Sequence, residues 1–172
     1  MVLLAAYSRK AELRMNPLGI YIETSVFNFY FSEQDEEKRR DTLKLFEEIR
    51  EGKYTPYASD AVLDELNRAS EPKQGQMVKL IDEFEVTILP VDEKSERLAD
   101  VYVEQGIIPE RYRTDGLHIA LTAVNGLYFI VSYNFQHIVK RKTIEMTEII
   151  NYQQGYKKVG IYSPTEVVEH EE

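Results

Sequence analysis

The chain has 172 residues and a mass of 20.1 kDa, which suits one domain with a buried core. Its 30 acidic and 21 basic residues give a net charge of −9, which disfavours broad nonspecific binding to nucleic acid but not a metal-assisted nuclease. The absence of cysteine excludes disulfides and thiolate metal sites, and no apolar run approaches the roughly 18 residues that span a bilayer.

The beginning of the chain does not have the pattern of a signal peptide, because its apolar stretch precedes its positive charges. We therefore predict a cytoplasmic protein. Met15 stands just before the first convincing strand, so residues 1–14 are interpreted as an N-terminal extension upstream of a second candidate start. We predict one domain over residues 15–163 and a frayed acidic tail over residues 164–172.

Short apolar runs alternate with longer helical patterns along the chain, which is typical of βαβ units and a mostly parallel sheet. Strands are predicted at residues 19–22, 53–57, 86–89, 127–131 and 158–162. Helices are predicted at residues 37–50, after a cap at Ser59, at 74–84, from a cap at Asp92 to about 105, at 115–125 and at 143–154. The pattern predicts a single α/β domain, in which ligands bind beyond the carboxyl ends of the strands.

Two glutamates fit that location. Glu23 directly follows the first predicted strand, although its charge would also favour the positive end of a helix capped by Thr24 or Ser25. Glu65 borders the buried stripe of the helix that follows Ser59, where a solvated surface glutamate is the alternative. Neither residue identifies a site by itself.

The helix that begins at Asp115 is apolar around most of its circumference and is predicted to be buried. Its polar residues, Asp115, His118 and Thr122, lie on one face and need partners if they are buried. Asp115 could instead serve only to stabilise the start of the helix, with His118 a satisfied core histidine. Just upstream, Arg111 and Arg113 suit either phosphate contact or a solvated surface.

The loop after the fourth strand contains Asn134, a neutral oxygen donor where chemistry could use an acid. Its alternative role is that of an ordinary turn asparagine. In a doubly wound sheet, this loop and the three acids can all open onto the same edge. Three carboxylates with a neutral oxygen suit a hard cation such as Mg²⁺ or Mn²⁺.

Together these segments resemble the PIN-domain family, which includes toxin ribonucleases of the VapC type. The resemblance spans residues 19–162 and rests on four motifs: Ile22-Glu23-Thr24-Ser25-Val26, the helix from Ser59 with Glu65, Thr114-Asp115-Gly-Leu-His118, and Val131-Ser-Tyr-Asn134-Phe followed by His137-Ile138. Two departures stand out, because Glu23 replaces the usual aspartate and Asn134 stands where an acid is common. Both are expected to weaken metal binding or to reposition the ion.

The resemblance implies a three-layer α/β/α sandwich and a metal-dependent endoribonuclease that uses Mg²⁺ or Mn²⁺. It implies Glu23 and Asp115 as the principal metal ligands, Glu65 as ligand of a second metal or orienter of water, and Asn134 in support. Residues expected to hydrogen-bond these ligands are Thr24, Ser59 and His118, and those expected to contact substrate are Arg111 and Arg113. Implied partners are RNA, a small antitoxin covering the acidic cleft, and, as is common in such families, a second copy of the chain.

Other functions remain open on the sequence. The two departures favour a binding or interaction module that keeps the fold with a decayed site. A phosphatase or phosphoacceptor domain also uses acids at strand ends, but the first loop lacks a closely spaced aspartate pair and no suitably placed lysine is found. A serine hydrolase is disfavoured because the Gly-x-Ser-x-Gly elbow is missing.

Overall fold

The computed structural model describes residues 17–170, so the predicted extension at residues 1–14 lies outside the described residues. The elements in chain order are β1 (Leu18–Ile22), α2 (Thr24–Tyr30), α3 (Glu36–Arg50), β2 (Tyr54–Ser59), α4 (Asp60–Leu66), α5 (Lys73–Glu83), β3 (Thr87–Leu89), α6 (Glu93–Glu104), η1 (Glu110–Tyr112), α7 (Arg113–Val124), β4 (Phe129–Val131), α8 (Arg141–Gln153), β5 (Gly160–Tyr162) and α9 (Pro164–Val167). None of the helices in this part of the chain combines the length and apolar character that crossing a membrane requires.

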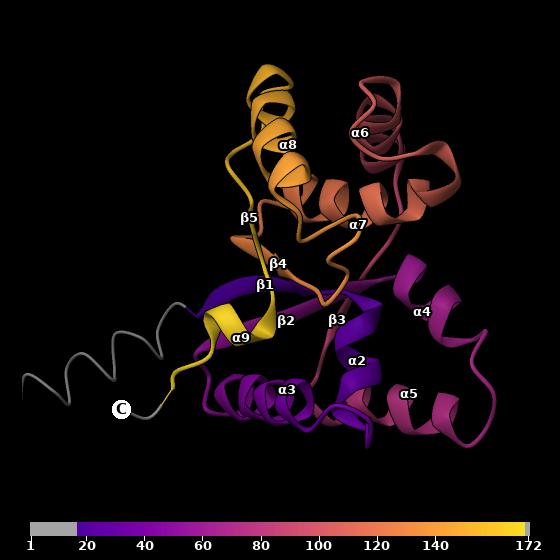
Figure 1. Ribbon diagram of the computed structural model, residues 1–172, viewed down its shortest axis with the longest axis vertical. Coiled ribbons are helices and arrows are strands. Elements are labelled where there is room, and N and C mark those ends of the chain that lie inside the picture. Colours follow the sequence, from indigo (N-terminus) through magenta and orange to yellow (C-terminus); the bar gives the residue numbers. More distant parts are fainter. Residues whose placement is uncertain (1–16, 171–172) are drawn as a thin grey trace, which may run out of the picture.

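The strands form one five-stranded sheet in the order β3-β2-β1-β4-β5, and every pairing is parallel. Figure 1 shows helices α6, α7 and α8 on one side of the sheet and α2, α3 and α5 on the other. The predicted three-layer α/β/α arrangement is therefore confirmed. The chain leaves β1 toward β2 and β3 and later returns to the other side of β1 as β4, so the order of strands reverses between β1 and β4. In open α/β sheets, ligands bind at such a reversal, beyond the carboxyl ends of the two strands.

The two central strands are buried because helices cover both faces of the sheet. Strand β1 contains Ile20, Tyr21 and Ile22, all fully buried, and β4 is also buried along its length. Such strands are continuous apolar runs rather than alternating ones, which is how the sequence predicts them. Helix α7 is buried over most of its length against this core, as its apolar circumference predicts.

All predicted strands and helices are present, with boundaries shifted by a few residues. Helix α2 is the helix that the sequence offers only in the alternative role of Glu23, because its aromatic and β-branched residues have weak helix propensity. Its N-cap residue is Glu23, not Thr24 or Ser25, and the Glu23 side chain makes no capping bond. The fifth strand is shorter than predicted and covers only Gly160–Tyr162.

The predicted frayed tail is wrong for the residues that directly follow β5. The short helix α9 packs against α3, and the Val168 side chain behind it is buried. Two buried carboxylates on α3 hold this segment: Asp41 Oδ2 accepts a hydrogen bond from Thr165 Oγ1 at 2.7 Å, and Glu48 Oε1 accepts one from Glu169 N at 2.9 Å. The folded unit therefore extends past residue 163.

Replacing Thr165 by valine should destabilise the protein by about 1–3 kcal/mol, because the buried Asp41 carboxylate would lose its hydroxyl donor while the side-chain volume stays similar. Chemical denaturation followed by circular dichroism measures the change. Thr87→Val on the edge strand β3, where the threonine is exposed, is the matched control. Equal stability losses in the two variants would show that the contact between α9 and α3 contributes little.

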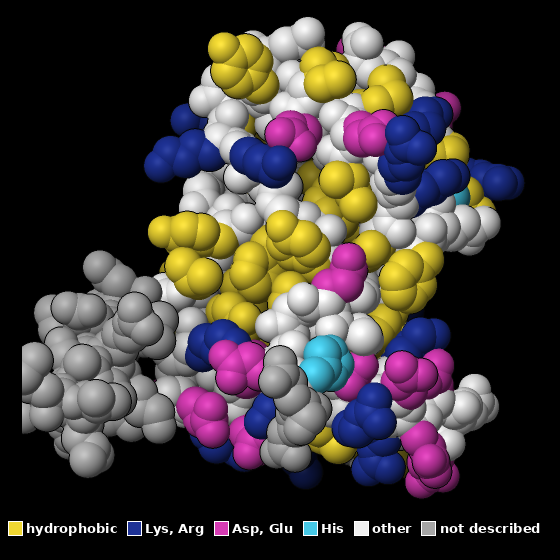
Figure 2. All heavy atoms as spheres, turned by 60° about the vertical axis from the view of Figure 1, so that its left-hand side comes forward, with side chains coloured by type: hydrophobic (Ala, Val, Ile, Leu, Met, Phe, Trp, Pro, Cys, Tyr) yellow, Lys and Arg dark blue, Asp and Glu magenta, His cyan; other side chains and the backbone are white. Residues whose placement is uncertain are grey.

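Apolar side chains also gather at the open edge of the sheet formed by β5. Figure 2 shows this band between the charged surfaces above and below it. The exposed large apolar residues of the chain include Leu18, Tyr128, Ile149, Tyr152 and Tyr162. The homodimer implied by the resemblance remains a prediction.

Candidate active site

Glu23 lies at the point where the order of strands reverses. It is the first residue after β1, and its N–H donates to Val131 O of the neighbouring strand β4 at 3.1 Å. The side chain is only 4% exposed, and its Oε2 accepts hydrogen bonds from Ser25 Oγ at 2.5 Å and Ser132 Oγ at 2.7 Å. Burying a carboxylate is unfavourable unless it is hydrogen-bonded. The two serines therefore hold Glu23 in a defined position at the sheet edge.

Glu65 reaches the same edge from α4 and is anchored by a histidine of α7. His118 Nε2 lies 2.6 Å from Glu65 Oε1, and His118 Nδ1 lies 2.7 Å from the hydroxyl of Tyr21. That hydroxyl lies in turn 2.6 Å from Ser59 Oγ at the end of β2. Tyr21, Ser59 and His118 are fully buried, whereas the Glu65 side chain is 29% exposed. One chain of hydrogen bonds thus links β1, β2, α7 and α4.

The prediction that the polar stripe of α7 finds partners is confirmed. His118 has a partner at each ring nitrogen, and Thr122 Oγ1 donates to His118 O at 2.9 Å. Asp115, in the first turn of the helix, is half-buried. The stripe therefore has one end at the sheet edge and the other in the core.

Asp115 is electrostatically coupled to the other acids. Burial raises the pKa of Asp115 above its ordinary value, and the charge of Glu23 adds to the rise, although His118, a hydrogen bond from Asn134 and the charge of His137 act against it. When burial and a second carboxylate raise the pKa of a carboxylate, its charged form is disfavoured, and a bound cation would offset that penalty. Asp115 is therefore within electrostatic range of Glu23, although it lies outside the close set formed by Glu23, Glu65 and His118.

The charges of Glu23, Glu65 and Asp115 all act on His118. Burial alone would lower the pKa of His118, but the hydrogen bond to Glu65 and the charges of Glu23, Glu65 and Asp115 raise it above its ordinary value. Burial alone would raise the pKa of Glu65, but the hydrogen bond and charge of His118 outweigh it and lower that pKa. Glu23 and Glu65 thus lie close to one imidazole, and the charge of Asp115 also acts on it.

Donor atoms of Glu23, Glu65 and His118 lie within 4.8 Å of one another, which is close enough to hold one metal ion. Beside them, the Thr24 side chain is buried, and its hydroxyl finds no hydrogen-bond partner in the described residues. The two carboxylates suit an oxygen-preferring cation such as Mg²⁺ or Mn²⁺, whereas both ring nitrogens of His118 are already engaged, by Glu65 and by Tyr21. This close set contains His118, whereas the predicted ligand set contained Asp115 instead.

Asn134 is placed differently from its predicted role as a neutral oxygen donor. Its Oδ1 accepts a hydrogen bond from His137 N at 3.0 Å, within the loop after β4. Its own backbone N–H donates to Ser132 Oγ at 2.9 Å. The amide oxygen of Asn134 is thus engaged within the loop, and the Asn134 side chain acts on the site by lowering the pKa of Asp115.

The remaining predicted residues lie near the site but with other partners. Ser59 hydrogen-bonds Tyr21 instead of a carboxylate. Arg113 Nε lies 2.5 Å from Asp100 Oδ1 of α6, so its guanidinium is already paired. Arg111 is exposed, with its guanidinium carbon 4.8 Å from the centre of the Tyr112 ring. Of the two arginines, the structure leaves Arg111 the freer to meet a phosphate.

The sequence analysis missed four residues of this site: Tyr21, Ser25 as a ligand holder, Ser132 and His137. The signal for Tyr21 was a hydroxyl inside a strand that is buried on both faces, which requires a partner. Ser132 follows β4 as Glu23 follows β1, so the two residues had to be neighbours once β1 and β4 were paired. The ring of His137 stacks on Tyr112 at 4.0 Å between ring centres.

No protein-family model matches the sequence, and no curated protein matches it. Among solved structures, the chain is similar to VapC20 of Mycobacterium tuberculosis, a toxin that cleaves the sarcin-ricin loop. The two share 16% sequence identity at a TM-score of 0.51, over 81% of this chain and 98% of that one. The chain has a VapC-type PIN fold. At this identity the likeness concerns the fold alone.

A second solved structure is VapBC2 of Rickettsia felis bound to a DNA fragment from its promoter. It matches this PIN fold at 16% identity and a TM-score of 0.47, over 69% of this chain and 90% of that one. The PIN fold explains why β1, α4, α7 and the loop after β4 converge, because all four begin or end at the carboxyl edge of the sheet.

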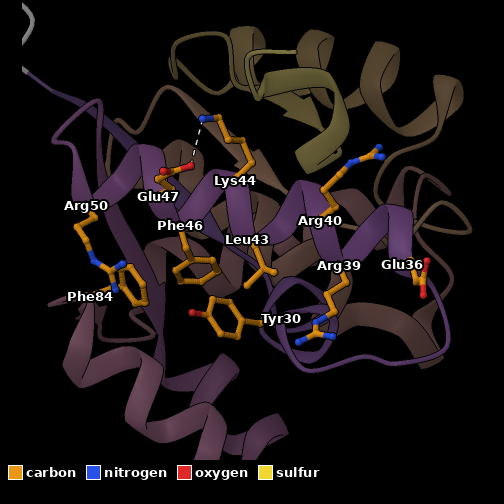
Figure 3. A pocket seen from close by; sticks show the side chains of 10 residues that line it. All are labelled: Tyr30, Glu36, Arg39, Arg40, Leu43, Lys44, Phe46, Glu47, Arg50 and Phe84. Atoms are coloured by element: carbon orange, nitrogen blue, oxygen red, sulfur yellow. Dashed lines mark hydrogen bonds and ion pairs between the residues drawn. The ribbon is translucent and has the colours of Figure 1, made fainter. Parts of the chain in front are cut away.

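A separate groove of about 730 Å³ runs along α3 and does not include the site carboxylates. Figure 3 shows Tyr30, Leu43 and Phe46 on its floor, with Arg39 and Arg50 toward its two ends. The guanidinium carbon of Arg50 lies 4.7 Å from the centre of the Phe84 ring. This groove thus combines an apolar floor with a rim that is basic on balance, because its four basic side chains outnumber Glu36 and Glu47.

Proposed function

We propose that this chain is a divalent-metal-dependent endoribonuclease whose active site is the crevice beyond β1 and β4. The observation that carries the proposal is the close approach of Glu23 and Glu65 beside His118 at the point where the strand order reverses, with the charge of Asp115 acting on the same imidazole. Ligand sites of open α/β sheets lie at this place. The PIN-type fold supports the assignment by analogy.

The cation would be held by Glu23, Glu65 and Asp115, while His118, whose two ring nitrogens face Glu65 and Tyr21, would orient the Glu65 carboxylate. When bound, Mg²⁺ or Mn²⁺ supplies an activated water for in-line attack on phosphorus and offsets the charge that develops on the leaving oxygen. We assign no further step to the cation.

The side chains of the chain itself keep the acids in place. Ser25 and Ser132 fix the Glu23 carboxylate, so it needs little reorganisation when a substrate phosphate approaches. Asn134 hydrogen-bonds Asp115 and favours its charged form. The role proposed for the exposed Arg111 is contact with an RNA phosphate.

The direct experiment is an assay with purified protein and single-stranded RNA, with Mn²⁺, with Mg²⁺ or with EDTA. Cleavage is expected with either metal and should stop in EDTA. Following the analogy with toxin ribonucleases, induced expression in bacteria should also arrest growth. Saturable Mn²⁺ binding without any cleavage of RNA would contradict the nuclease and leave a metal-binding module.

A binding function is the second candidate, and the α3 groove favours it. Its basic rim and apolar floor suit a partner segment that carries acidic and apolar side chains. Calorimetry with the protein encoded beside this gene tests the interaction: binding that Arg50→Glu leaves unchanged would place that partner elsewhere.

A further inference from the structure

We propose that Tyr21 is a positioning residue, which holds the Glu65 carboxylate in place through the imidazole of His118. The inference rests on the proposed function, because it describes how the same site is arranged. Tyr21 is the second-last residue of β1 and touches no site carboxylate in the hydrogen bonds of the described residues. It therefore acts on the site only through His118.

The hydrogen-bond chain determines how Glu65 can serve a cation. His118 occupies Glu65 Oε1 at 2.6 Å, which leaves Oε2 as the unshared oxygen of that carboxylate. A second partner at Nδ1, the Tyr21 hydroxyl at 2.7 Å, prevents the imidazole from turning. Glu65 consequently presents one oxygen, in one orientation, to the crevice.

Packing alone does not explain the tyrosine. A phenylalanine at position 21 would bury the same ring in β1 without a hydroxyl that needs a partner. The structure instead satisfies this hydroxyl with two buried side chains, Ser59 Oγ at 2.6 Å and His118 Nδ1 at 2.7 Å. Partners of this kind behind a metal ligand fix its orientation, and their loss typically weakens metal binding or activity by about 10–100-fold.

The test is Tyr21→Phe, with Tyr54→Phe as the matched control. Tyr54 is also a buried tyrosine, but it begins β2 at the opposite end of the sheet, where its hydroxyl donates to Val167 O at 3.2 Å. Titration calorimetry with MnCl₂ should give a dissociation constant about tenfold or more higher for Tyr21→Phe than for the control. Ser59→Ala, which removes only the outer hydrogen bond, should have a smaller effect in the same direction.

A readout that needs no metal separates this proposal from the proposed function. In wild type, the ring N–H of His118 that faces Glu65 should give a downfield, slowly exchanging proton resonance. That resonance should exchange faster in Tyr21→Phe and be unchanged in Tyr54→Phe. If wild type does not bind Mn²⁺ but the exchange rates differ as expected, the metal site is overturned and the positioning role of Tyr21 is not. Equal exchange rates in all three proteins, or equal Mn²⁺ affinities in both variants, would overturn the positioning itself.

Discussion

Replacing Asp115 by asparagine is expected to abolish Mn²⁺-dependent cleavage of RNA while the protein stays folded. The substitution keeps the shape of the side chain and removes its negative charge, so the site loses a carboxylate next to the Glu23 cluster. Losing several kcal/mol of metal-dependent stabilisation corresponds to a rate lower by about 10³-fold. Initial rates on single-stranded RNA measure the effect.

The fold should tolerate Asp115→Asn because the carboxylate is unfavourable where it lies. Burial and the charge of Glu23 raise its pKa, which means that the folded state disfavours the charged form. The melting temperature should therefore be no lower than that of wild type. The control is Asp100→Asn. It changes an exposed acid of α6 that pairs with Arg113, and it should keep full activity. Equal activity of Asp115→Asn and wild type would rule out the role assigned to Asp115.

Glu23→Asp is expected to lower activity by about 10²-fold, although aspartate is the usual residue in the family that this sequence resembles. The shorter side chain would withdraw its carboxylate from Ser25 Oγ and Ser132 Oγ, which contact it at 2.5 and 2.7 Å. A buried carboxylate that loses its donors is destabilised and poorly placed. The measurements are the cleavage rate and the Mn²⁺ dissociation constant.

A double-mutant cycle identifies the cause. Ser132→Ala should lower activity in the wild-type background and have little further effect in Glu23→Asp, because the hydrogen bond is already lost there. Higher activity of Glu23→Asp than of wild type would contradict this account. It would instead support the view from the sequence that glutamate at this position weakens the site.

The alternation of strands and helices was readable because local pattern determines it. Residues of β1 and β4 form continuous apolar runs, and the buried stripe of α7 has a helical period. Both patterns can be recognised in the sequence without knowledge of the tertiary fold. The convergence of Glu23, Glu65 and Asp115 could be expected from the same pattern. Parallel strands open their carboxyl ends onto one edge, and each acid follows a strand or begins a helix there.

Pairings between distant residues could not be obtained in this way. That Tyr21 meets His118, 97 positions later, depends on which face of β1 turns toward α7. The direction of the Asn134 amide depends on His137 N, and the docking of α9 on α3 depends on the buried Asp41 and Glu48. Each is set by packing rather than by local preference, because a polar side chain takes whichever partner the fold brings near.

By itself, the sequence determined the kind of fold and the edge of the sheet at which chemistry is proposed, since hydrophobic period and strand polarity are local properties. Only the tertiary structure decided which groups hold the acids: two serines for Glu23, and an imidazole and a buried tyrosine for Glu65. The physical reason is that a buried charge must find its hydrogen-bond partners, and these come from wherever the packed helices and strands place a donor.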